Sequence, residues 1–249
     1  MTYSICAFDE KTGELGVAVA SRFFAVGMLV PHIHIRRGAV ATQAFVNPLW
    51  GIDAADHLAA GYAPVDVVNA LVAADKGQAN RQLHMVDVQG RTAAHTGVDC
   101  VDWCGHRAAL GVSVAGNMLV GEAVIADTLA CYLDSADLPL AERLMTAMEA
   151  GEAAGGDKRG TQSAALIVHR DQPYPWLDLR ADDHPDPLAE LRRLYDVAHE
   201  RFTIVVKALP TVQNPHGWLE RGGIDKEIRE VDDRRKAEGR ESRSFGTPL

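Results

Sequence analysis

The sequence is poor in aromatic residues and cysteine, and it has no long apolar run. Aromatic residues make up 6% of the 249 residues, although hydrophobic residues together reach 47%. A core of this composition must rely on small side chains packed closely between layers. The four cysteines are too few in a chain of this length to form a disulfide framework, which favours a reducing, cytoplasmic location.

Basic residues are also in deficit. The 25 lysine and arginine residues are outnumbered by 34 aspartate and glutamate residues, and the pI is near 5.5. This balance argues against nucleic acid or an anionic membrane as a partner. No apolar run reaches the length of a membrane span, and the first residues lack the features of a secretory signal. We therefore expect a small-molecule substrate, with no nucleic-acid or membrane partner.

The functional prediction depends on the start of the chain. Two alternating runs, Tyr3–Phe8 and Leu15–Ala20, flank a polar turn that contains Gly13, which predicts a β-hairpin. Removal of Met1, usual before a small residue, would leave Thr2 with a free α-amine beside its hydroxyl. Such an amine has a pKa of about 8. It can therefore accept the hydroxyl proton and activate Thr2 as a nucleophile.

The other predicted elements alternate between groups of strands and pairs of helices. Hydrophobic periodicity predicts strands at His32–Arg37, Ala39–Phe45, Gln82–Val88, Thr92–Thr96, Leu110–Ala115, Ser163–Val168 and Trp176–Ala181. It predicts helices over residues 51–61, 63–77, 122–133, 140–154 and 186–202. This order suits two antiparallel sheets packed back to back under helices, or a simpler two-layer α+β fold. The run Leu15–Ser21 resembles Leu110–Gly116, which favours a symmetric double sheet.

A change of composition beyond Pro210 predicts a main domain over residues 1–210 and a charged extension over residues 211–249. Asp225–Arg243 is dense in arginine, glutamate and aspartate. It is expected to form either a solvated helix or a tail that packs on a partner subunit. We therefore expect a homo-oligomer.

Several segments between Thr2 and Asp183 are distinctive as a set: MTYSICAFD, GELGVAVASRFFAVG, GAVATQAFVNPLWG, AGNMLVG and AAGGDKRGTQSAAL. Together they resemble DUF1028, a bacterial family of unknown function grouped with the N-terminal nucleophile (Ntn) hydrolases. The resemblance implies a four-layer αββα sandwich with antiparallel sheets, of the α+β class, and an amide-bond hydrolase ancestry. In Ntn hydrolases the nucleophile opens a strand in the middle of the sandwich, and Thr2 matches this place. Proteasome-type members also use a lysine on the following strands, but Ser21–Phe45 contains none, so the α-amine is the expected base.

Three residues are predicted to form the catalytic centre. Thr2 would be the nucleophile and, through its amine, the general base. Asn117 would offer an amide donor to the oxyanion, or it is simply a turn residue after Gly116. Ser21 would bond the amine or relay its proton, or it is simply a half-buried strand residue. Ser4, on the same strand face as Thr2, is an alternative nucleophile if the amine is absent.

Substrate-binding residues are predicted at Gln43 and in the segment after the glycine pair at 155–156. Gln43 is polar in an otherwise small and apolar strand. Asp157 and Arg159 could hold an amine or a carboxylate of the substrate, and Gln162 and Ser163 add hydrogen-bonding groups. The same segment also fits a helix C-cap followed by a loop with an ion pair.

Two groups of residues offer metal ligands, but neither is a full set. His32 and His34 share a strand face, and Cys100 and Cys104 precede His106. We expect no metal and no cofactor. The sequence thus predicts a cytoplasmic Ntn-type amidohydrolase that cleaves an amide bond in a small or peptide-like substrate. The alternatives are a noncatalytic small-molecule binding or assembly protein of the same fold and a metal-dependent hydrolase that uses the two strand histidines.

Overall fold

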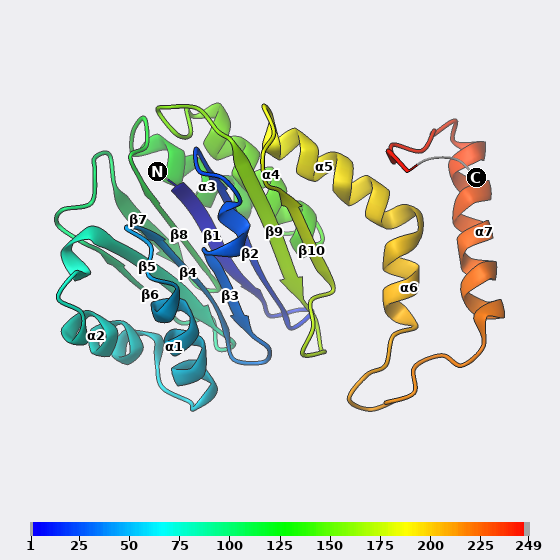
Figure 1. Cartoon of the computed structure of the whole chain (residues 1–249), viewed down its shortest axis with the longest axis horizontal. Coiled ribbons are helices and arrows are strands. Elements are labelled where there is room, and N and C mark those ends of the chain that lie inside the picture. The colour runs from blue at the N-terminus through cyan, green and yellow to red at the C-terminus, as the bar shows by residue number, and fades with distance from the viewer. Residues whose placement is uncertain (1, 247–249) are drawn as a thin grey trace. The chain divides into compact units, whose positions relative to one another are not determined.

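Two antiparallel sheets form the centre of the first of two units in the chain (Figure 1). The computed structural model describes residues 2–246; the first unit extends to Leu188 and the second starts at Ala189. The larger sheet has the strand order β10-β9-β2-β1-β8-β7, and the smaller has the order β3-β4-β5-β6. The strands are β1 Thr2–Asp9, β2 Glu14–Ser21, β3 Pro31–His34, β4 Gly38–Ala44, β5 Arg81–Asp87, β6 Thr92–Thr96, β7 Gly105–Ala109, β8 Val112–Asn117, β9 Ser163–His169 and β10 Leu177–Ala181.

The predicted N-terminal hairpin is present, and its first strand lies inside the larger sheet. β1 pairs with β2 on one side and with β8 on the other. Gly13, at a φ of 74°, closes the turn and donates its N–H to the Asp9 carbonyl at 2.8 Å. Because β1 has a neighbour on each side, the start of the chain is held in the middle of the sheet.

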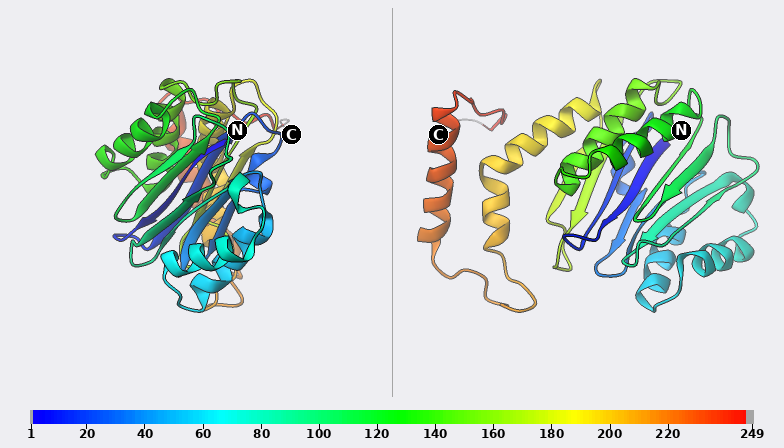
Figure 2. Two further views of the ribbon diagram at one scale, coloured as in Figure 1. Left: turned by 90° about the vertical axis from the view of Figure 1, so that its left-hand side faces the viewer. Right: turned by 180° about the vertical axis from the view of Figure 1, so that it is seen from behind.

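Helices cover the outer face of each sheet (Figures 1 and 2). The helices of this unit are α1 Pro48–Ala59, α2 Pro64–Ala74, α3 Ala123–Asp134 and α4 Leu140–Ala153. α4 packs on the larger sheet, where the Tyr3 hydroxyl donates to the Met148 carbonyl at 2.9 Å. α1 and α2 bury Trp50 and Val67 against Leu83 of the smaller sheet. The predicted α+β class with antiparallel sheets is confirmed, and the elements are arranged in layers.

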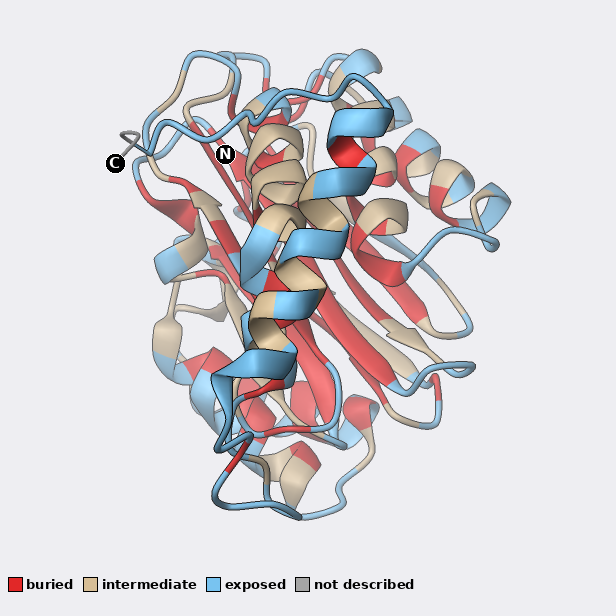
Figure 3. Ribbon diagram, turned by 90° about the vertical axis from the view of Figure 1, so that its right-hand side faces the viewer, coloured by how far each residue is buried: buried red, intermediate tan, exposed pale blue. Residues whose placement is uncertain are grey.

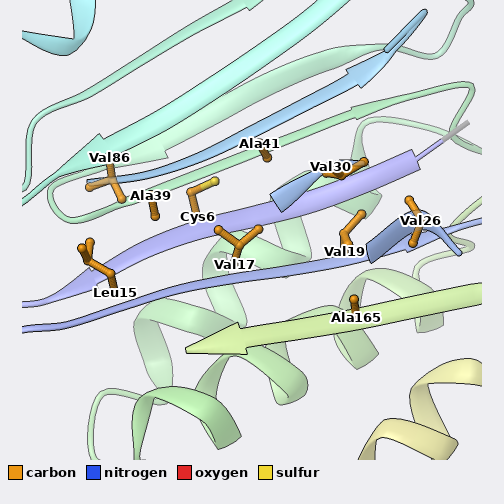
Figure 4. Close-up of a cluster of buried hydrophobic side chains, with 10 residues drawn as sticks. All are labelled: Cys6, Leu15, Val17, Val19, Val26, Val30, Ala39, Ala41, Val86 and Ala165. Carbon is orange, nitrogen blue, oxygen red and sulfur yellow. The ribbon is translucent and has the colours of Figure 1, made fainter. Parts of the chain in front are cut away.

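Small apolar side chains fill the space between the sheets, as the scarcity of aromatic residues predicted (Figure 4). The cluster there consists of Cys6, Leu15, Val17, Val19, Val26, Val30, Ala39, Ala41, Val86 and Ala165. Sheets lined by alanine and valine can approach closely at normal packing density. Figure 3 shows the strands as largely buried, whereas the loops are mostly exposed.

The structure differs from the prediction around β7 and β8. The predicted strand Leu110–Ala115 starts later, at Val112, because Gly111 adopts a left-handed φ of 78° and forms the turn after β7. β7 itself was not predicted. The two similar runs belong to β2 and β8, which flank β1 in one sheet. The similarity of the two runs therefore does not reflect a symmetry between the two sheets.

The second unit is helical. Its elements are α5 Pro187–Val197, which begins just before the unit, a π-helical stretch Ala198–Phe202, α6 Thr203–Lys207 and α7 Arg221–Ala237. Arg235 is the buried residue of α7, and its guanidinium contacts the carboxylates of Asp196 and Glu200, each at 3.2 Å. Residues 221–237 of the charged C-terminal stretch thus form a helix whose side chains are mostly exposed in the single chain. Over residues 2–246, no helix is long and apolar enough to cross a membrane.

Candidate functional site

A row of polar residues crosses the end of the larger sheet. Thr2 lies opposite Ser21 on one neighbouring strand and opposite Asn117 on the other, and Ser21 lies opposite Ser163. Directly opposed residues share a face of an antiparallel sheet. Ser4, two residues after Thr2, contacts β5 of the other sheet. The row therefore faces the space between the sheets.

The three predicted catalytic residues come together in this row. The Thr2 Oγ1 atom lies 3.1 Å from the Ser21 Oγ atom, and the Asn117 Nδ2 atom lies 3.5 Å from the Thr2 carbonyl oxygen. Only 6% of Thr2 is exposed, and Ser21 and Asn117 are buried. The predicted removal of Met1 concerns a residue outside the described part of the chain. The structure thus places the Ser21 hydroxyl and the Asn117 side-chain amide next to Thr2.

A small cavity of about 70 Å³ lies beside Thr2. We call it the Thr2 pocket; it is lined by Thr2, Phe23, Val26, Leu29, Val30, Gln43, Ala44 and Val46. The predicted nucleophile and the predicted binding residue Gln43 therefore line the same pocket, although they lie on different sheets.

A buried hydrogen-bond network connects Gln43 and Asn117. The Oε1 atom of Gln82 accepts a hydrogen bond from Gln43 Nε2 at 2.8 Å and another from Asn117 Nδ2 at 3.1 Å. The Gln82 Nε2 atom donates to the Gly116 carbonyl at 2.9 Å. Gln82 thereby orients both amides that flank Thr2.

Gln82 and His84 were not predicted from the sequence as site residues. A signal was present, because these polar residues alternate along β5 with the apolar Leu83 and Met85. In a strand between a sheet and a helical layer, such alternation places both polar residues on the inter-sheet face. Their hydrogen-bond partners lie on strands that are distant in the sequence, however, so no local sequence pattern identifies them.

His84 forms a second buried chain of hydrogen bonds. Its Nε2 atom lies 2.8 Å from Ser4 Oγ, and its Nδ1 atom lies 3.1 Å from Ser113 Oγ. Burial lowers the pKa of His84 to about 3, with a smaller contribution from His106. His84 is therefore neutral at neutral pH. Ser4 and His84 are fully buried, so a substrate cannot reach this pair.

The predicted binding segment, residues 157–163, mainly forms hydrogen bonds that hold parts of the backbone in place. The buried Asp157 carboxylate accepts hydrogen bonds from the N–H of Arg22 at 3.1 Å and of Arg159 at 2.8 Å. Gly155 and Gly156 have φ values of 115° and 49° and follow the end of α4. This geometry fits the alternative interpretation, a helix C-cap followed by a loop with an ion pair.

The other predicted residues of that segment also have protein partners. The Ser163 hydroxyl donates to the Phe23 carbonyl and accepts from the Val26 N–H at 3.0 Å. The Gln162 Nε2 atom donates to Asp183 at 3.1 Å, and the Arg159 guanidinium pairs with Asp157 at 3.4 Å. None of the residues 157, 159, 162 and 163 lines the Thr2 pocket. Ser163 supports it indirectly, because it fixes the segment that forms one wall.

The two histidines of β3 contact backbone oxygens. His32 Nε2 lies 3.2 Å from the Leu29 carbonyl and His34 Nδ1 lies 3.1 Å from the Ile35 carbonyl. Burial lowers the pKa of His32. In the part of the chain that the structure describes, no three histidine, cysteine, aspartate or glutamate residues are grouped so as to hold a metal.

Comparison with known proteins identifies a close structural relative. The crystal structure of a DUF1028 protein from Silicibacter pomeroyi has a TM-score of 0.82 and 32% sequence identity, and the match covers 88% of this chain and 99% of that chain. Anbu (ancestral beta-subunit) from Yersinia bercovieri has a TM-score of 0.39 and 12% identity over 85% of this chain and 99% of that chain, which is too low to support an argument. No curated protein matches significantly. The model of DUF1028, described as a family of unknown function, matches residues 2–191, and this chain belongs to that family.

Proposed function

We propose that this protein hydrolyses an amide bond in a small or peptide-like substrate, with Thr2 as an N-terminal nucleophile. The observation that carries the proposal is the convergence of the Ser21 hydroxyl and the Asn117 amide on Thr2, which lines the Thr2 pocket. The start of a central strand is also where an Ntn hydrolase holds its nucleophile, so we propose the Ntn-like sandwich as the fold.

The proposed reaction has two steps. After removal of Met1, the α-amine of Thr2 accepts the hydroxyl proton, and Oγ1 attacks the amide carbonyl. The carbon–nitrogen bond breaks, and the substrate amine leaves with that proton. Water then hydrolyses the acyl ester on Thr2, which regenerates the hydroxyl and releases a carboxylic acid.

Ser21 and Asn117 have distinct roles in this scheme. The Ser21 hydroxyl, 3.1 Å from Thr2 Oγ1, orients the nucleophile and relays its proton to the amine. The Asn117 side-chain amide exchanges its long hydrogen bond to the Thr2 carbonyl, 3.5 Å in the structure, for one to the oxyanion that forms during attack. Loss of one oxyanion donor costs about 100- to 1000-fold in rate in known cases. Gln82 holds Asn117 in place for this role.

The test is acyl trapping followed by intact-mass measurement. The N-terminus of the purified protein is first read by mass, and the protein is then incubated with p-nitrophenyl esters. The expected result is loss of Met1 and one acyl group per chain, located on Thr2. Thr2→Ala should abolish the adduct, whereas Thr12→Ala, which removes a hydroxyl from an exposed turn, should leave it unchanged.

Two results would overturn the proposal. An acyl group that persists on Thr2→Ala would assign the nucleophile to another residue. A chain that has lost Met1 and forms no adduct with any ester would favour the noncatalytic binding protein.

A further inference from the structure

We infer that the amide substrate carries a short aliphatic acyl group, and that this group occupies the Thr2 pocket. The inference rests on the proposed function, because it places the acyl carbon at Thr2 Oγ1. It adds the chemical class of the group that the site accepts.

The walls of the pocket are apolar. Val26 and Val30 are 2% and 3% exposed, and Leu29 and Val46 are half-buried beside them. Among the described residues that line the pocket, none has a charged side chain. A carboxylate or ammonium group placed against these walls would lose its hydration without gaining a side chain of opposite charge, and burying a charge in this way is costly. An uncharged hydrocarbon group is the chemistry that these walls favour.

The size of the pocket limits that group to a few carbon atoms. Its volume of about 70 Å³ is several times the roughly 10–15 Å³ that one water needs. It is far below the 300–1000 Å³ of pockets that enclose drug-sized ligands. A branched group of the size of isobutyryl fits this volume, whereas a long acyl chain would extend beyond it.

The wall formed by residues 23–30 is held in place by contacts with β9 and with Asp182. Ser163 bonds the backbone of Phe23 and Val26, and the Ala25 N–H donates to the Asp182 carbonyl at 3.0 Å. Gly27 packs so closely on β9 that a Cβ atom there would lie 2.4 Å from the Ala165 Cβ atom. A wall held in this way cannot move outward to admit a longer chain, so the pocket should discriminate by length.

Gln43 provides the polar end of the pocket. One donor and one acceptor of its amide are bonded to Gln82 and Ser4, and a carboxamide has two N–H donors and two acceptor lone pairs. Gln43 therefore retains capacity to bond the amide of the substrate while the apolar residues enclose the acyl group.

The first experiment measures acylation of Thr2 by a series of p-nitrophenyl esters: acetate, isobutyrate, isovalerate, octanoate and succinate. In each case the Thr2 Oγ1–carbon bond forms, the bond to p-nitrophenolate breaks, and the hydroxyl proton passes to the α-amine. After correction for uncatalysed hydrolysis, isobutyrate should react at least tenfold faster than octanoate and succinate, because poor fit in an apolar pocket costs roughly 10- to 200-fold. Equal rates across the series would overturn the inference.

Substitutions inside and outside the pocket test whether the preference for isobutyrate arises there. Val46→Phe narrows the pocket from a half-buried position and should remove the preference for isobutyrate over acetate, while Val65→Phe, at an exposed position of α2, should preserve it. Val30→Ala enlarges the pocket and should move the optimum toward isovalerate. An unchanged preference in both pocket variants would place the acyl group elsewhere.

A binding measurement separates this inference from the proposed function. Saturation-transfer NMR with isobutyramide is performed on Thr2→Ala and on Thr2→Ala combined with Val46→Phe. Binding that is lost in the second protein supports the pocket even if no ester acylates Thr2, in which case only the catalytic proposal fails. Absence of binding together with unselective acylation of Thr2 overturns the pocket and leaves the catalytic proposal intact.

Discussion

At the scale of single residues, the site depends on hydroxyls and amides that satisfy one another away from water. The Thr2 and Ser21 hydroxyl oxygens lie 3.1 Å apart, and the side-chain amides of Asn117 and Gln43 both donate to Gln82 Oε1. A buried donor left without a partner costs about 1–3 kcal/mol. Each of these side chains is therefore held in one orientation, which is the condition for a preorganised site.

Ser21→Ala tests the hydroxyl pair. The substitution keeps the strand and removes the partner of Thr2 Oγ1, so acylation by p-nitrophenyl isobutyrate should slow by roughly five- to tenfold, since one hydrogen bond contributes about 1 kcal/mol. Stopped-flow release of p-nitrophenolate measures the rate, with Thr12→Ala as the control. An unchanged rate would remove Ser21 from the proposed mechanism.

His84 predicts a specific pH dependence of stability. Burial lowers its pKa to about 3 from the ordinary value of 6.5, so between these values the unfolded chain binds a proton that the folded chain does not. The free energy of unfolding should therefore fall as the pH decreases from 6.5, by up to about 1.4 kcal/mol per pH unit. His84→Gln should flatten the curve between pH 6.5 and 5, measured by urea unfolding. Parallel curves for the two proteins would contradict a neutral, buried His84.

At the scale of secondary-structure elements, β5 links the two sheets. Its inward residues Gln82 and His84 bond to side chains on β1 and β8 of the larger sheet. Polar groups at this interface make the sheet packing specific, because any shift of one sheet against the other would leave several of them unpaired.

Gln82→Leu should therefore destabilise the first unit strongly. It leaves the Gln43 and Asn117 amides without the acceptor they share and the Gly116 carbonyl without its donor, at about 1–3 kcal/mol for each buried group. Gln89→Leu, at an exposed turn position, should change stability by less than about 0.5 kcal/mol. Thermal unfolding of the two variants measures the difference, and similar melting temperatures would show that the network contributes little.

The local elements were largely predictable from the sequence, and their long-range pairing was not. The hairpin of β1 and β2 follows from alternation around a turn, and the main helices follow from their periodicity. The pairing of Thr2 with Asn117 depends on contacts 115 residues apart, and the resemblance to a family, rather than any spacing, suggested it. The partners of Gln82 and His84 were missed for the same reason, since each lies on a strand remote in the sequence.

At the scale of the whole molecule, the chain consists of two units with different kinds of core. The first buries small apolar side chains between sheets, whereas the second buries apolar residues such as Ile204 together with Arg235, whose guanidinium contacts the carboxylates of Asp196 and Glu200. The pKa of Asp196 is lowered by its hydrogen bond to Arg235. The DUF1028 match ends at residue 191, close to the start of the second unit.

Arg235→Met should destabilise the second unit selectively. It leaves the two carboxylates without this guanidinium, and hydrogen bonds to charged groups contribute about 1.5–3 kcal/mol. Hydrogen exchange should accelerate in α5 and α7 while β1 and β8 keep their protection. Lys226→Met, at an exposed position of the same helix, is the control. Equal acceleration in the β-strands would show that the two units unfold together.

The position of β1 between β2 and β8 has a consequence for biosynthesis. Ser21 is translated 19 residues after Thr2, whereas Asn117 follows 115 residues after it, roughly 6–23 s at usual rates of translation. Throughout that interval the nascent polypeptide lacks the amide that completes the row. The chain on the ribosome therefore cannot perform the chemistry of the finished site until most of the first unit has been synthesised.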